Sequence, residues 1–526
     1  MFLMLWKNKG IDMKKGVLNL DEKRITYAKS LGEKIANDVF DEIKSYTTKS
    51  IERAILRILG INGINSKGVP YVNSVIDKLQ EKDSLSKGTI FLLSNSLIKL
   101  NVDSIQKLIE DIDNDKIDIA KIELSDKEKI KIVAKDLIKD GVSKIIDKKR
   151  ERENLISEYP LKEKPYLYVI VATGNIYEDA KQVKSAAYIG ADMIAIIRST
   201  AQSLLDYVPY GLTTEGYGGT YATQENFRFI RETLDEISKD TKKYVKLVNY
   251  SSGLCMPEIS ALAAIERLDL MVNDALYGII FRNINPLRTM IDQRFSRFIL
   301  HIGGIPIVTG EDNLIKTVDS KEFYYTVIVS QIINEQLAKN SGMNEDEIGL
   351  GHAFELDPNL ENGFLYELAQ AQLVRELFPN SPIKYMPPTR YKTGNIFFSH
   401  IMDTLFNIVS VLTDQEIQLL GMLTEALHTP FVQDRYLSIE NAQYIKNNLK
   451  SISNEFYIKD DGIIRKRAFE VFDKSVEKLE EISSIGIFKA LEEGYFSETK
   501  RPKKEGRGYD GVIKKDDDYL ELNDLI

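Results

Sequence analysis

Polar and aromatic side chains stand at the ends of several apolar, strand-like segments of the chain, where they could bind a charged ligand. The residues that combine such a side chain with such a place are Arg198, Ser203, Ser252, Tyr277, Arg282, Asp312 and Lys384. Guanidinium and hydroxyl groups bind phosphate, an aromatic face packs on a planar ring, and an aspartate with a lysine matches the two charges of an amino acid. The pattern therefore indicates a site for a phosphorylated, planar, amine-bearing ligand.

Each of these residues also has an ordinary structural alternative. A serine after a strand most often caps the next helix, Tyr277 could pack in a core, and Asp312 could serve in a turn or as a cap. Their occurrence at successive strand ends favours a functional site, because the active site of a parallel barrel lies at the carboxyl ends of its strands.

The elements that must position these residues begin at Pro165, where the pattern changes to buried strands. Apolar runs of strand length lie at 166–174, 193–198, 244–250, 268–274, 304–310, 348–354 and 382–386. Helical segments separate them, at 178–188, 224–238, 257–267, 321–338 and 364–377. This alternation predicts an α/β fold, a closed (β/α)8 TIM-type barrel with N-terminal and C-terminal helical additions. A doubly wound open sheet is the alternative, and the eighth strand is expected between Phe397 and Leu412.

Helical regions flank the predicted barrel. Apolar residues recur at three- and four-residue steps from Ile25 to Ile43, and Ser125 and Glu128 have the capping-box spacing that predicts a helix start. The polar tail from Ser497 is expected to be flexible, unless it orders against a partner chain. The predicted organisation is an extension (1–12), a helical region (13–160), the ligand-binding barrel (161–430), and a C-terminal helical region with the tail (431–526).

Composition excludes several classes of protein. The chain of 526 residues is 43% hydrophobic and 28% charged, which is typical of folded globular proteins. One cysteine, Cys255, excludes an intramolecular disulfide framework and a Cys-x-x-Cys zinc site, and favours the reducing cytoplasm. A net charge of −9 with mixed signs disfavours nucleic acid or an anionic membrane as the main partner. No segment reaches the roughly 18 uninterrupted apolar residues of a membrane span.

Several cofactor and metal motifs are absent from the sequence. The glycine-rich segment GLTTEGYGG (211–219) lacks the Lys and Ser/Thr of a Walker loop, and GYGGTY lacks the last glycine of the dinucleotide fingerprint. No His-Glu-x-x-His occurs, and none of the four histidines belongs to the Asp-x-His-x-x-Gly sequence of base-off cobalamin proteins. We therefore expect no metal site and no cobalamin site of that kind in this chain.

Long segments around the candidate residues resemble the α subunits of lysine 5,6-aminomutases, which depend on adenosylcobalamin and pyridoxal 5'-phosphate. The segments are IIRSTAQSLLDYVPYGLTTEGYGGTYATQENFRFIRE (196–232), VNYSSGLCMPE (248–258), MVNDALYGIIFRNIN (271–285), GEDNL (310–314) and PIKYMPPTRYKTGNIF (382–397). The resemblance extends from about Met13 to the end of the chain. It implies a barrel with extra helical regions and a heterotetramer with two copies of a separate β subunit. That subunit carries the cobalamin-binding domain and the lysine that holds pyridoxal phosphate as a Schiff base.

The same resemblance implies roles for the candidate residues. Tyr277 would stack on the pyridine ring and Ser252 would lie by the pyridine nitrogen. Arg198 and Ser203 would belong to the cofactor site around the phosphate, and Arg282 would lie near the cofactor. In the substrate site, Asp312 would hold the α-ammonium group and Lys384 the carboxylate.

The implied reaction is a radical 1,2-migration of the terminal amino group of D-lysine or L-β-lysine from C6 to C5. Its products would be 2,5- or 3,5-diaminohexanoate. Three alternatives stay open. The chain could belong to a related aminomutase that acts on another diamino acid, to a pyridoxal-phosphate enzyme with its own Schiff-base lysine, for which Lys384 is the candidate, or to a non-catalytic scaffold that keeps the barrel.

Overall fold

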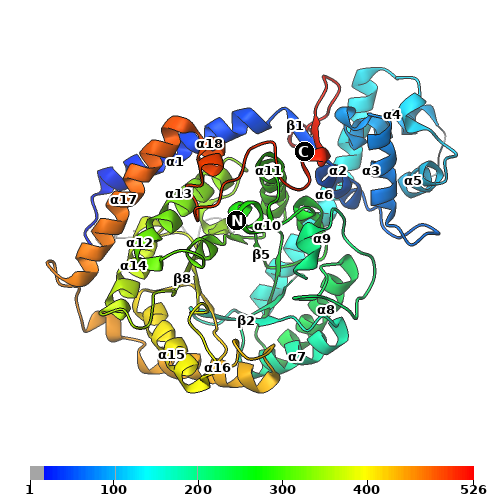
Figure 1. The fold of residues 1–526 in the computed structure, drawn as a ribbon. Coiled ribbons are helices and arrows are strands. Elements are labelled where there is room, and N and C mark those ends of the chain that lie inside the picture. Colours follow the sequence, from blue (N-terminus) through cyan, green and yellow to red (C-terminus); the bar gives the residue numbers. More distant parts are fainter. Residues whose placement is uncertain (1–16, 101, 103, 198) are drawn as a thin grey trace, which may run out of the picture.

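A closed barrel of parallel strands forms the centre of the computed structural model, which describes residues 17–100, 102, 104–197 and 199–526. The strands are β2 (Tyr166–Val171), β3 (Met193–Ile196), β4 (Lys246–Tyr250), β5 (Leu270–Val272), β6 (Ile307–Val308), β7 (Ile348–Gly349), β8 (Gly351–Ala353), β9 (Lys384–Met386) and β10 (Ile417–Leu419). Only Leu350 separates β7 from β8; β7 pairs with β6 and β8 with β9, so together they fill one strand position. Because β10 pairs with both β9 and β2, the eight positions close into the (β/α)8 barrel that the sequence predicts (Figure 1).

Alternating burial along the strands builds two cores. On β2, Tyr166 and Tyr168 pack with residues of the other strands inside the barrel, whereas Leu167 and Val169 pack against the surrounding helices. Strands buried on both faces need apolar residues on both sides. This requirement explains the continuous apolar runs in the sequence.

A ring of helices surrounds the strands (Figure 1). It consists of α7 (Ile176–Ile189), α8 (Gln224–Thr241), α9 (Met256–Ile265), α11 (Pro286–Ile302), α13 (Tyr325–Lys339), α14 (Gly363–Leu377), α15 (Ile396–Leu412) and α16 (Val432–Asn448). Two short elements precede members of the ring on the carboxyl side of the strands. They are α10 (Ala275–Arg282) after β5 and the 3₁₀ helix η4 (Glu311–Ile315) after β6.

The predicted position of the eighth strand is wrong. Residues 397–412 belong to helix α15, and β10 follows it as a strand of three residues. Buried Met402, Phe406 and Val409 repeat at four- and three-residue steps, which is the helical period. The β10 strand is too short for its own pattern to stand out from the preceding helix.

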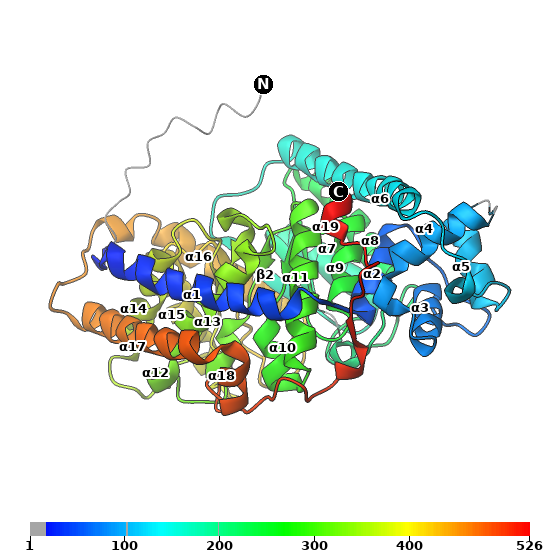
Figure 2. The same cartoon turned by 90° about the horizontal axis from the view of Figure 1, so that it is seen from above.

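The N-terminal helices extend the barrel to one side. They are α1 (Glu22–Ile43), α2 (Lys49–Ile58), α3 (Tyr71–Glu81), α4 (Thr89–Lys99), α5 (Ile105–Asp113) and α6 (Lys127–Glu158), and Figure 2 shows α3, α4 and α5 gathered at one end of the molecule. The cap of α6 differs from the prediction: the Asp126 carboxylate, and not Ser125, accepts a hydrogen bond from the Lys129 N–H at 3.1 Å. No described helix is long and apolar enough to cross a membrane.

The C-terminal tail is ordered against the chain itself, so the prediction of a flexible tail is wrong. After α17 (Ile463–Ile485) and α18 (Ile487–Glu493), residues 501–514, here called the C-terminal strap, run across the barrel to the N-terminal helices. The strap ends in β11 (Val512–Lys514), which pairs antiparallel with β1 (Tyr46–Thr48). Polar composition suggested disorder, but backbone hydrogen bonds to the rest of the chain hold the strap in place.

Candidate active site

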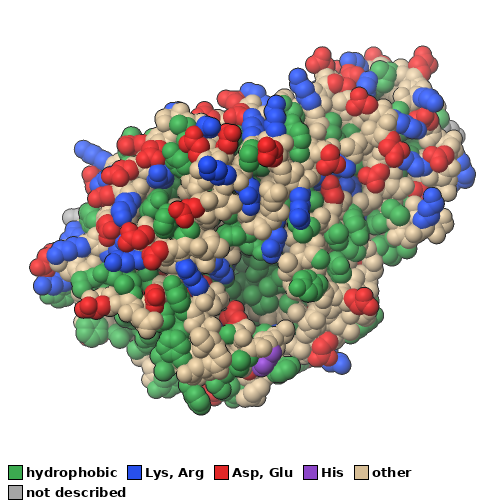
Figure 3. Space-filling view, in the orientation of Figure 1, with side chains coloured by type: hydrophobic (Ala, Val, Ile, Leu, Met, Phe, Trp, Pro, Cys, Tyr) green, Lys and Arg blue, Asp and Glu red, His purple; other side chains and the backbone are tan. Residues whose placement is uncertain are grey.

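The residues predicted from strand ends lie at the carboxyl end of the barrel. Figure 3 shows this face hollowed at its centre, with hydrophobic side chains around the hollow and Lys and Arg side chains to one side. Ser203, Ser252, Tyr277 and Asp312 come from segments that follow β3, β4, β5 and β6. Arg198 lies outside the described residues.

Lys384 and Asp312 form a buried pair across the barrel. Lys384 is the first residue of β9 and Asp312 lies in η4, and the Lys384 Nζ is 3.5 Å from the Asp312 Oδ1. Burial alone would lower the pKa of Lys384, but the Asp312 carboxylate outweighs it and raises that pKa. Neither carboxylate oxygen of Asp312 accepts a hydrogen bond within the described part of the chain, although the residue is fully buried. A buried carboxylate requires such partners, so the site fits a ligand that carries an ammonium group.

Two further buried carboxyl groups lie beside Asp312. Burial and the neighbouring Asp312 raise the pKa of Asp274 to about 6. Burial and Asp274 raise the pKa of Glu311 to about 8, and Glu311 accepts hydrogen bonds from Asn334 Nδ2 at 2.9 Å and Gly351 N at 3.2 Å. This end of the barrel therefore concentrates acidic groups, and it favours a cationic ligand.

Tyr277 and Arg282 form a second pair on α10. The Asp274 carboxylate caps this helix by accepting a hydrogen bond from the Leu276 N–H at 3.1 Å. Arg282 Nη2 donates to the Tyr277 hydroxyl at 2.7 Å, and the guanidinium carbon lies 5.3 Å from the ring centroid. The Tyr277 ring is half-buried, and the buried Arg282 Nε has no hydrogen-bond partner among the described residues. The pair therefore offers an aromatic face and an unsatisfied N–H donor.

Ser203 and Ser252 stand on two loops that touch. Ser203 lies in the 3₁₀ helix η3 (Ala201–Leu204), and its carbonyl accepts a hydrogen bond from the Leu254 N–H at 3.1 Å. Between these loops, Gly253 has φ +98°, and a Cβ added there would lie 2.5 Å from the Ser203 carbonyl oxygen. Helix α10 contacts both η3 and η4. The structure thus brings the predicted residues together in three groups, which α10 connects.

The glycine-rich segment supports one of these loops. Thr200, which directly precedes η3, binds this segment. The Thr200 N–H donates to the Tyr217 carbonyl at 2.9 Å, and its hydroxyl donates to the Gly218 carbonyl at 3.1 Å. Because the segment packs on η3, it acts as part of the scaffold of the site. Among the described residues, no group of three or more His, Cys, Asp or Glu side chains is arranged to hold a metal ion.

Comparison with known proteins decides the family. The family model described as the D-lysine 5,6-aminomutase TIM-barrel domain of the alpha subunit matches residues 18–524. The chain belongs to the lysine 5,6-aminomutase α-subunit family. It is 53% identical over 502 residues to the lysine 5,6-aminomutase alpha subunit of Acetoanaerobium sticklandii, a match that covers 95% of this chain and 96% of that protein.

A second lysine 5,6-aminomutase alpha subunit agrees with this assignment, and a more distant match is a subunit of another aminomutase. The chain is 49% identical over 506 residues to the lysine 5,6-aminomutase alpha subunit of Fusobacterium nucleatum, covering 96% of this chain and 98% of that one. It is 25% identical over 369 residues to the D-ornithine 4,5-aminomutase subunit beta of Acetoanaerobium sticklandii, covering 68% of this chain and 50% of that protein. The resemblance to lysine 5,6-aminomutase α subunits and the TIM-barrel fold are confirmed.

Proposed function

We propose that this chain is the catalytic α subunit of a lysine 5,6-aminomutase. It would move the terminal amino group of D-lysine or L-β-lysine from C6 to C5, giving 2,5- or 3,5-diaminohexanoate. Two lysine 5,6-aminomutase alpha subunits match this chain over nearly its full length, at 53% and 49% identity, and this supports the proposal. The observation that carries it is the buried pair of Asp312 and Lys384, 3.5 Å apart, in which both Asp312 oxygens lack a hydrogen-bond donor among the described residues.

This pair is suited to the two ends of an amino acid. Asp312 would accept hydrogen bonds from the substrate α-ammonium group, and Lys384 would donate to its carboxylate. Both side chains are almost fully buried, with exposed fractions of 0% and 3%. Charge interactions are stronger in such a water-poor site than at the surface, so the pair would fix the substrate at one end and leave the terminal amino group free to react.

Membership in an aminomutase family implies cofactor-dependent catalysis, and the remaining site residues fit pyridoxal 5'-phosphate. Tyr277 would stack on its ring, Ser252 would lie by its pyridine nitrogen, and Ser203 would lie around its phosphate together with Arg198. Arg282 would lie near the cofactor. The unsatisfied Arg282 Nε and the half-buried Tyr277 face match this ligand. When bound, pyridoxal phosphate would hold the migrating nitrogen, and adenosylcobalamin would supply the radical that removes hydrogen.

A separate β subunit would complete the enzyme as a heterotetramer with two of each chain. It would carry the cobalamin-binding domain and the lysine that forms the Schiff base. The names of the two nearly full-length relatives as alpha subunits support a subunit partner, as does a match to a subunit of D-ornithine 4,5-aminomutase. The absence of Asp-x-His-x-x-Gly from the sequence supports placing cobalamin on the partner. Cys255 is buried and is the single cysteine of the sequence, so the chain forms no intramolecular disulfide, which fits the reducing cytoplasm.

Co-expression with a cobalamin-binding β subunit tests the proposal. The purified complex, given adenosylcobalamin and pyridoxal phosphate, should convert D-lysine or L-β-lysine to the corresponding diaminohexanoate, and this chain alone should not. Ornithine in the same assay tests the related-aminomutase alternative. Borohydride reduction and peptide mapping test whether the Schiff-base lysine lies in this chain, because a label on Lys384 would make this chain an ordinary pyridoxal-phosphate enzyme.

A further inference from the structure

Asp206 is held by two arginines three residues after Ser203. Arg288 donates from Nη1 and Nη2 to its two carboxylate oxygens, each at 2.7 Å, and Arg53 Nη2 donates to Oδ1. The Arg53 and Arg288 side chains are 1% and 0% exposed. Burial would raise the pKa of Asp206, but these guanidiniums outweigh it and hold that pKa well below its usual range. Two buried cations thus fix one carboxylate on the loop of Ser203.

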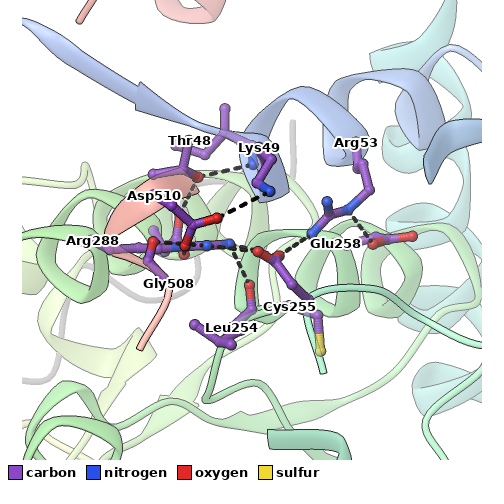
Figure 4. Close-up of polar contacts among 12 residues, drawn as sticks. Thr48, Lys49, Arg53, Leu254, Cys255, Glu258, Arg288, Gly508 and Asp510 are labelled. Carbon is purple, nitrogen blue, oxygen red and sulfur yellow. Dashed lines mark hydrogen bonds and ion pairs between the residues drawn. The ribbon is translucent and has the colours of Figure 1, made fainter. Parts of the chain in front are cut away.

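Arg288 also binds the loop of Ser252. From α11, its Nη2 donates to the carbonyl of Leu254, two residues after Ser252, at 3.0 Å. Its Nη1 donates to the carbonyl of Gly508 in the C-terminal strap at 3.1 Å, and Figure 4 shows Arg288 beside Leu254 and Gly508. One side chain therefore joins the loops of both serines and the strap.

Arginines of helix α2 also bind both loop regions. Besides binding Asp206, Arg53 donates from Nε to Glu258 Oε2 at 3.2 Å, and Arg57 Nη2 donates to Glu258 Oε1 at 2.9 Å. Glu258 lies in the first turn of α9, directly after the loop of Ser252. Asp206 and Glu258 thus connect the two loops of the site to Arg53 of α2, and Figure 4 shows Arg53 beside Glu258.

The two loops also contact each other directly, and the network anchors both of them to the surrounding helices and the strap. The Leu254 N–H donates to the Ser203 carbonyl at 3.1 Å, and the Cys255 thiol lies 3.7 Å from the Gln202 carbonyl. Gly253 leaves no room for a side chain between them. A change at Asp206 or Arg288 would therefore shift Ser203 and Ser252 relative to one another.

We propose that Asp206 and Arg288, with Arg53, are positioning residues that set the spacing of Ser203 and Ser252 for pyridoxal phosphate. The inference rests on the proposed function, since it concerns the two serines assigned to that cofactor. Asp206, Arg288 and Arg53 bond to other parts of the chain. The network acts through the backbone of the two loops, and small displacements of binding groups are costly because orientation determines how well they bind.

The test compares pyridoxal-phosphate affinity in the complex of this chain with its β subunit. In Asp206→Asn and Arg288→Lys, the dissociation constant of the cofactor, measured by absorbance titration of the cofactor-free complex, should rise about tenfold or more. Asp269→Asn is the matched control. Its carboxylate also pairs with a buried arginine and is more deeply buried than that of Asp206, with exposed side-chain fractions of 2% and 26%. It accepts from Arg231 Nη1, Tyr244 OH and Leu247 N, each at 2.7 Å, at the amino end of β5, whereas the serine loops follow the carboxyl ends of β3 and β4.

A purely structural role predicts a different result. The three variants would then lower the melting temperature to similar extents and bind pyridoxal phosphate as tightly as the wild type, which would overturn the inference. Asp206→Glu should recover part of the affinity, because it keeps the charge. If Asp206→Asn does not fold, Arg288→Lys decides alone. A wild-type complex that does not bind pyridoxal phosphate would instead contradict the proposed function.

Discussion

Among the described residues, Asp312 pairs with Lys384 and lies beside two further carboxyl groups, those of Asp274 and Glu311. Burying several acids around one lysine is unfavourable unless some carboxyl groups stay protonated or a cation is bound. The raised pKa values of Asp274 and Glu311, to about 6 and about 8, follow from this crowding. At the scale of single residues, the described part of the site thus favours the binding of an additional positively charged group.

Removing the lysine of the pair should mainly affect catalysis. For Lys384→Ala, kcat/KM should fall, because the variant leaves no partner for the substrate carboxylate. The fall should correspond to a loss of about 2 to 4 kcal/mol in transition-state binding. Steady-state kinetics of the complex measure this effect. A variant with a lower melting temperature and wild-type kcat/KM would show that the pair is only structural.

The pKa of Asp274 predicts how stability depends on pH. Its folded-state pKa of about 6 lies above its ordinary value of 3.8, so the folded state binds the proton more tightly than the unfolded state. Its contribution to stability is full below pH 3.8 and is lost as pH rises through about 6. Asp274→Asn removes this titration and keeps a side chain that can cap α10.

Melting temperatures at pH 5 and pH 8 check the prediction. The free energy of unfolding of Asp274→Asn relative to the wild type should be higher at pH 8 than at pH 5, by on the order of 1 to 3 kcal/mol. An equal difference at both pH values would contradict the assigned burial of an ionisable carboxyl group.

Whether a site residue could be predicted from sequence depended on its position relative to a strand-like run. Asp312 and Lys384 were predictable because each falls at or within a strand-like run. Asp274 also follows such a run, so the strand-end rule could have identified it. Asp206 gives no local indication, because its partners Arg53 and Arg288 lie 153 and 82 residues away in the chain.

At the scale of elements, the C-terminal strap closes over α10 and α11. Asn285 Nδ2 donates to the carbonyls of Lys503 at 2.8 Å and Glu505 at 2.7 Å, and its Oδ1 accepts from the Arg288 N–H at 2.8 Å. Arg501 Nε donates to the carbonyl of Ile279 in α10 at 2.7 Å. The strap therefore supports the helix that carries Tyr277.

Asn285→Ala should loosen the strap. The variant loses two side-chain hydrogen bonds to the strap and the cap of α11, a cost of about 1 to 3 kcal/mol. Limited proteolysis should then cut within 501–514 faster than in the wild type, and the melting temperature should fall. As a control, Asn448→Ala removes an exposed bond to the Tyr444 carbonyl at the end of α16 and should change neither. Unchanged proteolysis in Asn285→Ala would show that the strap does not depend on this residue.

The predictability of an element follows its length and the location of its contacts. Strand β2 was clear from sequence because its six residues are buried on both faces. Strand β10 was missed because it has three residues and follows an apolar helix. The strap was taken for a flexible tail because its partners are backbone groups of distant segments, which composition does not reveal.

At the scale of the whole molecule, the N-terminal helical region and the C-terminal strap meet beside the barrel. Strand β11 pairs with β1, and the network of Asp206, Arg288 and Arg53 joins the N-terminal helices, the strap and two loops of the site. The flanking regions thus support the two loops of the candidate site. The barrel class and the family were predictable from sequence, whereas this bracing depends on contacts between segments hundreds of residues apart.

The most direct test of the account follows the migrating nitrogen. The complex of this chain with its β subunit should be given adenosylcobalamin, pyridoxal phosphate and lysine labelled with nitrogen-15 at the terminal amino group. Mass spectrometry and NMR should find the label bonded to C5 of a diaminohexanoate. Recovery of the lysine with its label still on C6, from a complex that binds both cofactors, would contradict the central claim.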